Sequence, residues 1–194
     1  MSANWLEHLT GPRTPTGYRP GVTLGHLQRN LGLEGFTCLE PGLARFTYRK
    51  DGPPLEVSER TESHLLMHLV MSEFRLRVPT RQAGTLRLSV RHSGVVRRTG
   101  LACRLQEGER ARFEAFQARL NTDATLRAAL MPLDFKRLLL DCRNGQWQVT
   151  LEHMGGSEVV NRMPSFRRYI PLGADQRSHL WRAFDALEQA LRDS

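Results

Sequence analysis

The chain has 194 residues with 28 basic and 20 acidic side chains, which gives a formal net charge of +8. Hydrophobic residues make up 40% and charged residues 25%, a composition that is typical of a globular domain and excludes a disordered tail, a collagen-like repeat and a coiled coil. The longest nearly apolar stretch, residues 65–71, is far shorter than the roughly 20 residues that a membrane-spanning helix requires.

We expect a cytoplasmic protein without a cofactor. The three cysteines, Cys38, Cys103 and Cys142, are widely spaced and predict reduced thiols rather than a disulfide framework or a C-x-x-C zinc site. Residues 1–9 lack the apolar run of a signal peptide. No phosphate-binding loop, dinucleotide-binding glycine motif or G-x-S-x-G motif occurs, which lowers the expectation of an enzyme.

The first half of the chain predicts an extended arm, a helix and a series of strands. Three prolines and three glycines between residues 10 and 22 favour an arm over 1–22, followed by one domain over 23–194. Thr23 is suited to cap a helix over 23–33. Alternating apolar residues between turn signals predict strands at 43–50, 55–60, 64–78, 85–91 and 95–105.

The second half predicts helices on both sides of a β-hairpin region. Helical periodicity covers 107–120 and 123–130, and an amphipathic helix covers 173–192. Gly155-Gly156 predicts a hairpin turn that leads to a strand ending near Ile170.

Asn144-Gly145 is the strongest local signal in the chain. This dipeptide favours a two-residue hairpin turn between strands at 135–143 and 146–154. The turn fixes the register and places apolar pairs on one face and polar pairs on the other. The expected apolar pairs are Cys142 with Trp147, Leu140 with Val149, and Leu138 with Leu151.

These elements predict an α+β fold. We expect an antiparallel sheet of roughly six to eight strands, covered on one face by helices near 24–33, 107–130 and 173–192. Segments 36–79 and 128–171 share the pattern Phe-Arg-x-x-(Val/Ile)-Pro at corresponding places, which predicts an internal repeat of two α-β-β-β halves.

The most informative feature is a stretch over residues 74–106, here named the arginine run, which contains eight arginines and no acidic residue. Because side chains alternate between the two faces of a strand, several of these arginines lie on the face opposite to that of their apolar neighbours. If the strands at 64–78 and 85–91 pair with each other, their arginines share one face of the sheet. The arginines are Arg75, Arg77, Arg81, Arg87, Arg91, Arg97, Arg98 and Arg104.

An arginine face has two interpretations. Either it binds an anionic partner, or carboxylates such as Glu56, Glu59 and Glu62 from a neighbouring strand neutralise it. The expected partner is an acidic protein or a polyanion such as nucleic acid, and an anionic membrane surface fits equally well. The run lacks interleaved aromatic residues, so contacts to nucleic acid would be to phosphate.

The histidines offer weaker candidates. His64 and His68 have a spacing compatible with a metal pair, but their apolar neighbours favour buried histidines without a metal. His153 lies too far along its strand from Cys142 to form a Cys–His pair.

The Asn144-Gly145 hairpin, Trp147, Gly155-Gly156 and the segment 166–171 resemble a proteobacterial family of proteins of unknown function. The resemblance covers most of the chain, and implies a bacterial cytoplasmic protein but no activity and no site residues. The arginine run leads us to predict a non-enzymatic binding or adaptor protein that presents the arginine face. Sequence-independent nucleic-acid binding is one alternative, and a small-molecule binder or enzyme with a cavity between sheet and helices, lined by His64, His68 or His153, is another.

Overall fold

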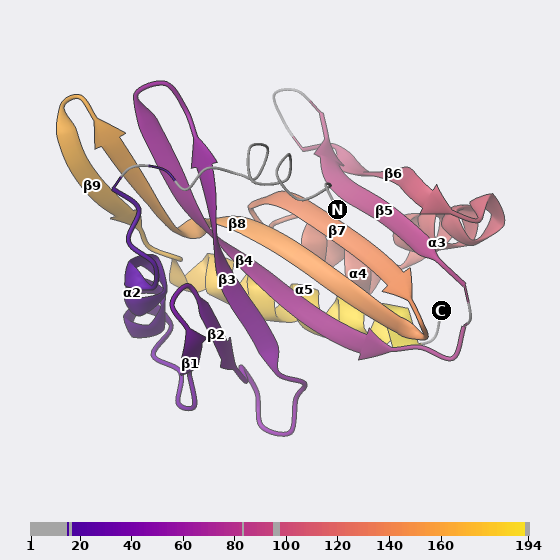
Figure 1. Cartoon of the computed structure of the whole chain (residues 1–194). Coiled ribbons are helices and arrows are strands. Elements are labelled where there is room, and N and C mark those ends of the chain that lie inside the picture. The colour runs from indigo at the N-terminus through magenta and orange to yellow at the C-terminus, as the bar shows by residue number, and fades with distance from the viewer. Residues whose placement is uncertain (1–14, 16, 83, 95–97, 193–194) are drawn as a thin grey trace, which may run out of the picture.

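The computed structural model describes residues 15, 17–82, 84–94 and 98–192, and this part of the chain forms an α+β fold (Figure 1). Four helices accompany nine strands in it, one strand more than the upper end of the expected range. In chain order the elements are α2 (Val22–Leu31), β1 (Thr37–Glu40), β2 (Leu43–Phe46), β3 (Leu55–Ser63), β4 (Met67–Pro79), β5 (Leu86–Ser93), β6 (Gly100–Gly108), α3 (Arg110–Thr122), α4 (Ala124–Leu130), β7 (Phe135–Arg143), β8 (Gln146–Arg162), β9 (Ser165–Ile170) and α5 (Ala174–Arg192).

The strands form a single antiparallel sheet in the order β1-β2-β3-β4-β8-β7-β5-β6, and β9 pairs with the last part of β8. The described helices pack against one face, which we name the core face, and α5 runs along it behind β4 and β8 in Figure 1. The opposite face is named the open face. The expected α+β class with helices on one side is thus confirmed.

The β7–β8 hairpin has the predicted register. Cys142 pairs with Trp147, Leu140 with Val149, and Leu138 with Leu151 across the Asn144-Gly145 turn. Asn144 and Gly145 both have positive φ angles, as a two-residue turn that matches the strand twist requires. The six apolar side chains are buried on the core face, where they join one continuous core.

Aromatic side chains link α5 to the middle of the sheet. Phe184 lies 6.4 Å, centroid to centroid, from both Phe74 on β4 and Tyr48 after β2. Phe46 makes an edge contact with Phe74 at 6.4 Å and with Trp181 at 6.0 Å. Because Phe46, Phe74 and Phe184 are at most 2% exposed, this cluster holds the C-terminal helix on the core face.

The first helix begins one residue earlier than predicted, and Thr23 does not cap it. Its N-cap is Gly21, and the Thr23 hydroxyl donates a hydrogen bond to the buried Glu158 carboxylate. The Glu59 carboxylate on β3 instead accepts hydrogen bonds from the backbone amides of Gly21 and Leu24, both at 2.9 Å. A distant strand thus supplies the acceptor that a cap residue normally provides. Most of the predicted arm, residues 1–14 and 16, lies outside the described residues.

The predicted hairpin at Gly155-Gly156 is wrong. Both glycines lie inside β8, where the pairing with β4 jumps from Ser72↔His153 to Val70↔Glu158. Gly156 has a φ of +81°, so the pair forms a bulge that bends one long strand rather than a turn that ends it. The hairpin turn instead lies at Met163-Pro164, between β8 and β9.

The predicted internal repeat stays a prediction. Segment 36–79 contains the four strands β1-β2-β3-β4 and segment 128–171 contains the three strands β7-β8-β9, and consecutive strands pair antiparallel in both. The two segments differ in their place in the sheet, because β4 lies between β3 and β8 whereas β9 pairs only with β8.

Candidate functional site

The arginine run does not form the two-stranded face that the sequence suggested. β4 and β5 are not neighbours, because β8 and β7 lie between them. Arg75 is opposite Thr150 of β8, and Arg87 is opposite Asp141 of β7. The connection between β4 and β5 therefore crosses two strands, and carboxylates of other strands enter between the arginines.

Carboxylates pair with several arginines of the run. Arg77 contacts Glu56 at 3.2 Å, Arg87 approaches Asp141 at 3.7 Å, and Arg98 contacts Asp134 at 2.6 Å. Arg75 pairs with the adjacent Glu73. The run is thus partly neutralised by acidic residues outside it.

The three glutamates that the sequence suggested as neutralising groups have different roles. Glu56 accepts from Arg45 and Arg77, and the hydrogen bond from Arg45 is the main cause that lowers its pKa. Glu62 pairs with Lys136, whose hydrogen bond lowers the pKa of Glu62. Glu59 instead caps α2, as described above.

Glu152 on β8 is the most buried carboxylate of the open face, and the predicted hairpin register already places it opposite Arg137. Its side chain is 1% exposed, and its oxygens accept from Arg60 Nη1 at 2.8 and 2.9 Å and from Arg137 Nη1 at 3.0 Å. Arg60 is on β3 and Arg137 is on β7, so this cluster crosses four adjacent strands. The contact with Arg60 depends on long-range strand order and leaves no local signal in the sequence.

Three candidates of the run remain without a carboxylate partner among the described residues. Arg81 lies in the loop between β4 and β5, Arg91 on β5 and Arg104 on β6, and all three are exposed. Arg97 lies outside the described residues. The surplus positive charge of the run is therefore concentrated toward β5 and β6.

The structure separates the two candidate metal ligands. His64 is exposed beyond the end of β3, with Nε2 3.4 Å from the Glu62 carboxylate, whereas His68 is fully buried on β4 with neither ring nitrogen hydrogen-bonded. The β3–β4 turn lies between them. Within the described ranges no group of at least three His, Cys, Asp and Glu side chains is placed to hold a metal.

His153 is buried in a complete hydrogen-bond network. Its Nδ1 accepts from the Gly155 amide at 2.8 Å, so its Nε2 carries the proton and donates to the Gln176 side-chain oxygen at 3.0 Å. Burial is the main cause that lowers the pKa of His153. These contacts hold a neutral ring and fix α5 to the sheet.

We expect the free energy of unfolding to fall as the pH drops below about 6.5, the ordinary pKa of histidine. Burial is the main cause that lowers the pKa of His68, His92 and His153 in the folded chain. Below that pH the unfolded chain binds more protons than the folded chain, so protonation favours unfolding. Urea unfolding across the range from about pH 8 to 5 measures the effect.

A second loss of stability is expected below about pH 4.3, where the lowered pKa values of Glu56 and Glu62 make the folded chain the weaker proton acceptor. For the histidines, a free energy of unfolding that stays constant or rises as the pH falls from about 7 to 5 would contradict their assignment as buried and neutral.

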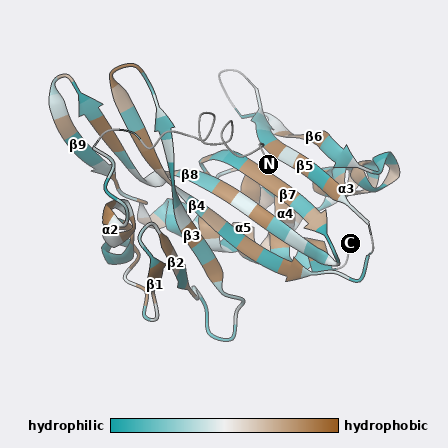
Figure 2. Ribbon diagram, in the orientation of Figure 1, coloured by the Kyte–Doolittle hydropathy of each residue, from teal (hydrophilic) through white to brown (hydrophobic). Residues whose placement is uncertain are grey.

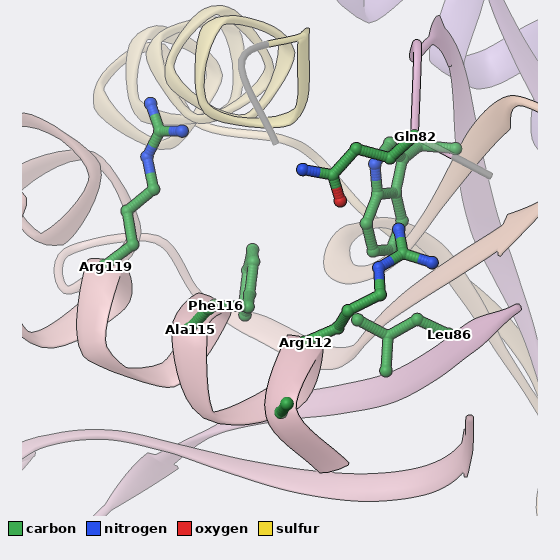
Figure 3. A pocket seen from close by; sticks show the side chains of 8 residues that line it. Gln82, Leu86, Arg112, Ala115, Phe116 and Arg119 are labelled. Atoms are coloured by element: carbon green, nitrogen blue, oxygen red, sulfur yellow. The ribbon is translucent and has the colours of Figure 1, made fainter. Parts of the chain in front are cut away.

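A pocket of about 440 Å³ lies between α3 and the sheet, within the volume range of small-molecule sites. Figure 3 shows Arg112 and Arg119 extending from α3, Phe116 between them, and Gln82 approaching from the β4–β5 loop. We name this cavity the α3 pocket. Its lining consists of Gln82, Leu86, Ala111, Arg112, Ala115, Phe116, Arg119 and Trp147.

The lining combines an apolar floor with cationic groups. Leu86, Phe116 and Trp147 are buried, and the short side chains of Ala111 and Ala115 leave space between α3 and the sheet. Arg112 Nη2 is 3.8 Å from the Cys142 sulfur, and Arg119 Nε is 4.0 Å from the Asp123 carboxylate. Both arginines share the lining of the α3 pocket with the apolar residues Leu86 and Phe116.

Trp147 contributes a buried donor to this lining. The residue is 1% exposed, and its indole Nε1 has no hydrogen-bond partner in the described structure. A buried N–H group without an acceptor is rare in folded proteins because its desolvation is uncompensated. The Trp147 side chain, which lines the α3 pocket, thus carries a donor that the described residues leave unsatisfied.

The predicted cavity between sheet and helices is present, but its lining residues differ from those expected. None of the candidate histidines His64, His68 and His153 lines the α3 pocket. Arg112 and Arg119 are seven positions apart, which places them two turns apart on one face of α3. That spacing was visible in the sequence, but the packing of α3 over Trp147 was not.

Comparisons with known proteins give a family and no activity. In the described ranges no helix combines the length and apolarity needed to cross a membrane. Neither the curated proteins nor the solved structures contain a match to the chain. The model of the family described as protein of unknown function DUF3156 matches residues 29–191, which include all nine described strands and the α3 pocket, and the chain belongs to this family.

Proposed function

We propose that the chain is a non-enzymatic binding protein that takes a small amphipathic anion into the α3 pocket. The observation that carries this proposal is the unpartnered indole N–H of Trp147 in a lining that also contains two arginines. An anionic head group would accept a hydrogen bond from Trp147 and interact with Arg112 and Arg119. An apolar body would cover Leu86 and Phe116.

The ligand chemistry follows from the size and polarity of the α3 pocket. A volume of about 440 Å³ suits a ligand of the size of a medium-chain carboxylic acid and is too small for a segment of nucleic acid. The lining contains no carboxylate, so an anion meets no like charge within it. Decanoate is a suitable probe because it combines one carboxylate with a flexible apolar chain.

Arg112→Gln is expected to weaken decanoate binding by about tenfold, because a hydrogen bond to a charged group contributes about 1.5 kcal/mol or more. Isothermal titration calorimetry on the full chain measures the change. Arg110→Gln is the matched control, since Arg110 belongs to the same helix but is 81% exposed and pairs with Glu114. Equal affinities for both variants, or no binding by the unaltered chain, would overturn the proposal.

The arginine run supports a second candidate function, which is binding of an acidic protein or a polyanion such as nucleic acid. The supporting observation is the exposure of Arg81, Arg91 and Arg104 without carboxylate partners in the described structure. We rank it second because Arg75, Arg77, Arg87 and Arg98 already have acidic partners. Phosphate contacts would make such binding steeply salt-dependent.

Binding to heparin, double-stranded DNA and single-stranded RNA from about 50 to 500 mM salt tests this second candidate. Affinity for all three that falls steeply with salt, and that is reduced by Arg91→Gln/Arg104→Gln, would favour it. Absence of binding at the lowest salt would reject it.

We retain the cytoplasm as the proposed compartment, because the three cysteines are free.

A further inference from the structure

Large apolar side chains are exposed at the ends of two hairpins. Leu65 and Leu66, at the β3–β4 turn, are 89% and 55% exposed. Met163 and Phe166, at the β8–β9 turn, are 76% and 45% exposed. Among the described residues, the one other large apolar side chain with comparable exposure is Leu39 on β1. We name the four residues at the two turns the hairpin tips.

The two hairpins are joined into one projection of the sheet. Met67 of β4 pairs with Asn161 of β8, and the Arg162 amide donates to the Leu66 carbonyl at 2.8 Å. Figure 1 shows both hairpins extending side by side beyond the helices, and Figure 2 colours the same projection by hydropathy. The hairpin tips therefore belong to one end of the molecule, and hydrogen bonds between the strands hold them together.

The charge around the hairpin tips is positive. Residues 64–67 and 161–168 include three arginines and no acidic residue. Arg167 pairs with Glu158 at 2.9 Å. Arg162 and Arg168 are exposed and have no ion pair with another described residue. Two unpaired cations therefore lie beside four exposed apolar side chains.

This combination matches an anionic lipid surface. Basic residues near such a surface are attracted to its negative charge, and apolar side chains on turns can enter the boundary between head groups and acyl chains. A protein partner is less well matched, because a stable interface requires about 800 Å² from each side with an apolar centre, whereas the tips are the ends of two turns. A backbone hydrogen bond closes the β3–β4 turn, because the His64 amide donates to the Met67 carbonyl at 2.8 Å. This bond holds the turn that carries Leu65 and Leu66.

We propose that the hairpin tips dock the protein onto an anionic phospholipid membrane, with Leu65, Leu66, Met163 and Phe166 entering the interface and Arg162 and Arg168 contacting lipid phosphates. This inference is independent of the α3 pocket. Trp147 is the second residue of β8 and Arg162 is its last, so the pocket and the tips lie at opposite ends of that strand.

Co-sedimentation of the full chain with vesicles tests the docking. The vesicles consist of phosphatidylcholine alone or with one third phosphatidylglycerol, at about 100 mM salt. We expect binding to the anionic vesicles and little binding to the neutral ones. Leu65→Ser/Met163→Ser is expected to weaken binding by about thirtyfold through lost apolar burial. Arg162→Gln/Arg168→Gln is expected to weaken it by about thirtyfold, since each basic residue contributes about fivefold.

Matched variants control for nonspecific effects. Leu39→Ser removes an exposed leucine on β1, and Arg91→Gln/Arg104→Gln removes two exposed arginines on β5 and β6, so both should leave vesicle binding unchanged. Arg112→Gln should also leave it unchanged, which separates this result from the test of the α3 pocket.

Three outcomes would overturn the docking proposal. The first is failure of the full chain to sediment with anionic vesicles. The second is a loss of binding in Arg91→Gln/Arg104→Gln equal to that in the tip variants, which would assign lipid binding to the open face. The third is concentration-dependent self-association that Leu65→Ser/Met163→Ser abolishes, which would assign the tips to a second copy of the chain.

Discussion

Phe184→Ala is expected to lower the free energy of unfolding by about 4 kcal/mol, and the melting temperature by about 10 °C for a chain of this size. Phe184 is fully buried on α5 and contacts both Phe74 and Tyr48. Alanine would remove the apolar burial and leave a cavity between α5 and the sheet, because neighbours on strands and helix relax only in part.

Urea unfolding followed by circular dichroism measures this effect, with Phe166→Ala as the matched control. Phe166 is 45% exposed on β9, so its truncation should cost less than about 0.5 kcal/mol. Similar losses in both variants would contradict the assignment of the aromatic cluster as the contact that holds α5 to the sheet.

Glu152→Gln is expected to lower the free energy of unfolding by about 2 kcal/mol. The change keeps the shape of the side chain but removes the charge that Arg60 and Arg137 share. Breaking a fully buried ion pair costs about 3–5 kcal/mol, but these arginines are 42% and 38% exposed, so water compensates part of the loss.

Glu107→Gln is the control for Glu152→Gln, because it removes an equal charge from an ion pair in which both partners are 50% exposed. It should cost less than about 0.5 kcal/mol. Both variants raise the net charge equally, so both should raise heparin affinity at low salt. If Glu152→Gln were as stable as Glu107→Gln, the cluster around Glu152 would not be a structural centre of the open face.

Local sequence patterns were sufficient to predict the elements whose partners are close in sequence. The β7–β8 register followed from Asn144-Gly145 and from the alternation on both sides of it, because a two-residue turn leaves one pairing. The C-terminal helix followed from its apolar stripe, which includes Leu180, Phe184 and Leu187.

Local sequence patterns did not predict the contacts between elements that are distant in the chain. The interval between β4 and β5 is short, yet β8 and β7 enter between them from later in the chain. Gly155-Gly156 suits a bulge as well as a turn, and continued pairing with β4 decides in favour of the bulge. The neutralisation of Arg87 by Asp141 depends on the same strand order.

The candidate site shows the same division between local and distant information. The basic character of the chain and a cavity between sheet and helices were both predicted. The lining was not, because Trp147 was assigned to the core from the hairpin alone and α3 had no predicted partner strand. The pocket arises where α3 crosses the start of β5 and β8 and meets Leu86 and Trp147.

The hydrogen-bonding state of the Trp147 indole is the most direct test of the proposed ligand site. The chain has three tryptophans, so its indole N–H groups give three resonances in a nitrogen–proton NMR spectrum, and Trp147→Phe assigns the one of interest. We predict that decanoate shifts the Trp147 resonance downfield in a saturable manner, and that Arg112→Gln requires about tenfold more ligand. A Trp147 resonance that is unchanged at saturating decanoate would contradict the proposal that this buried donor binds the anion.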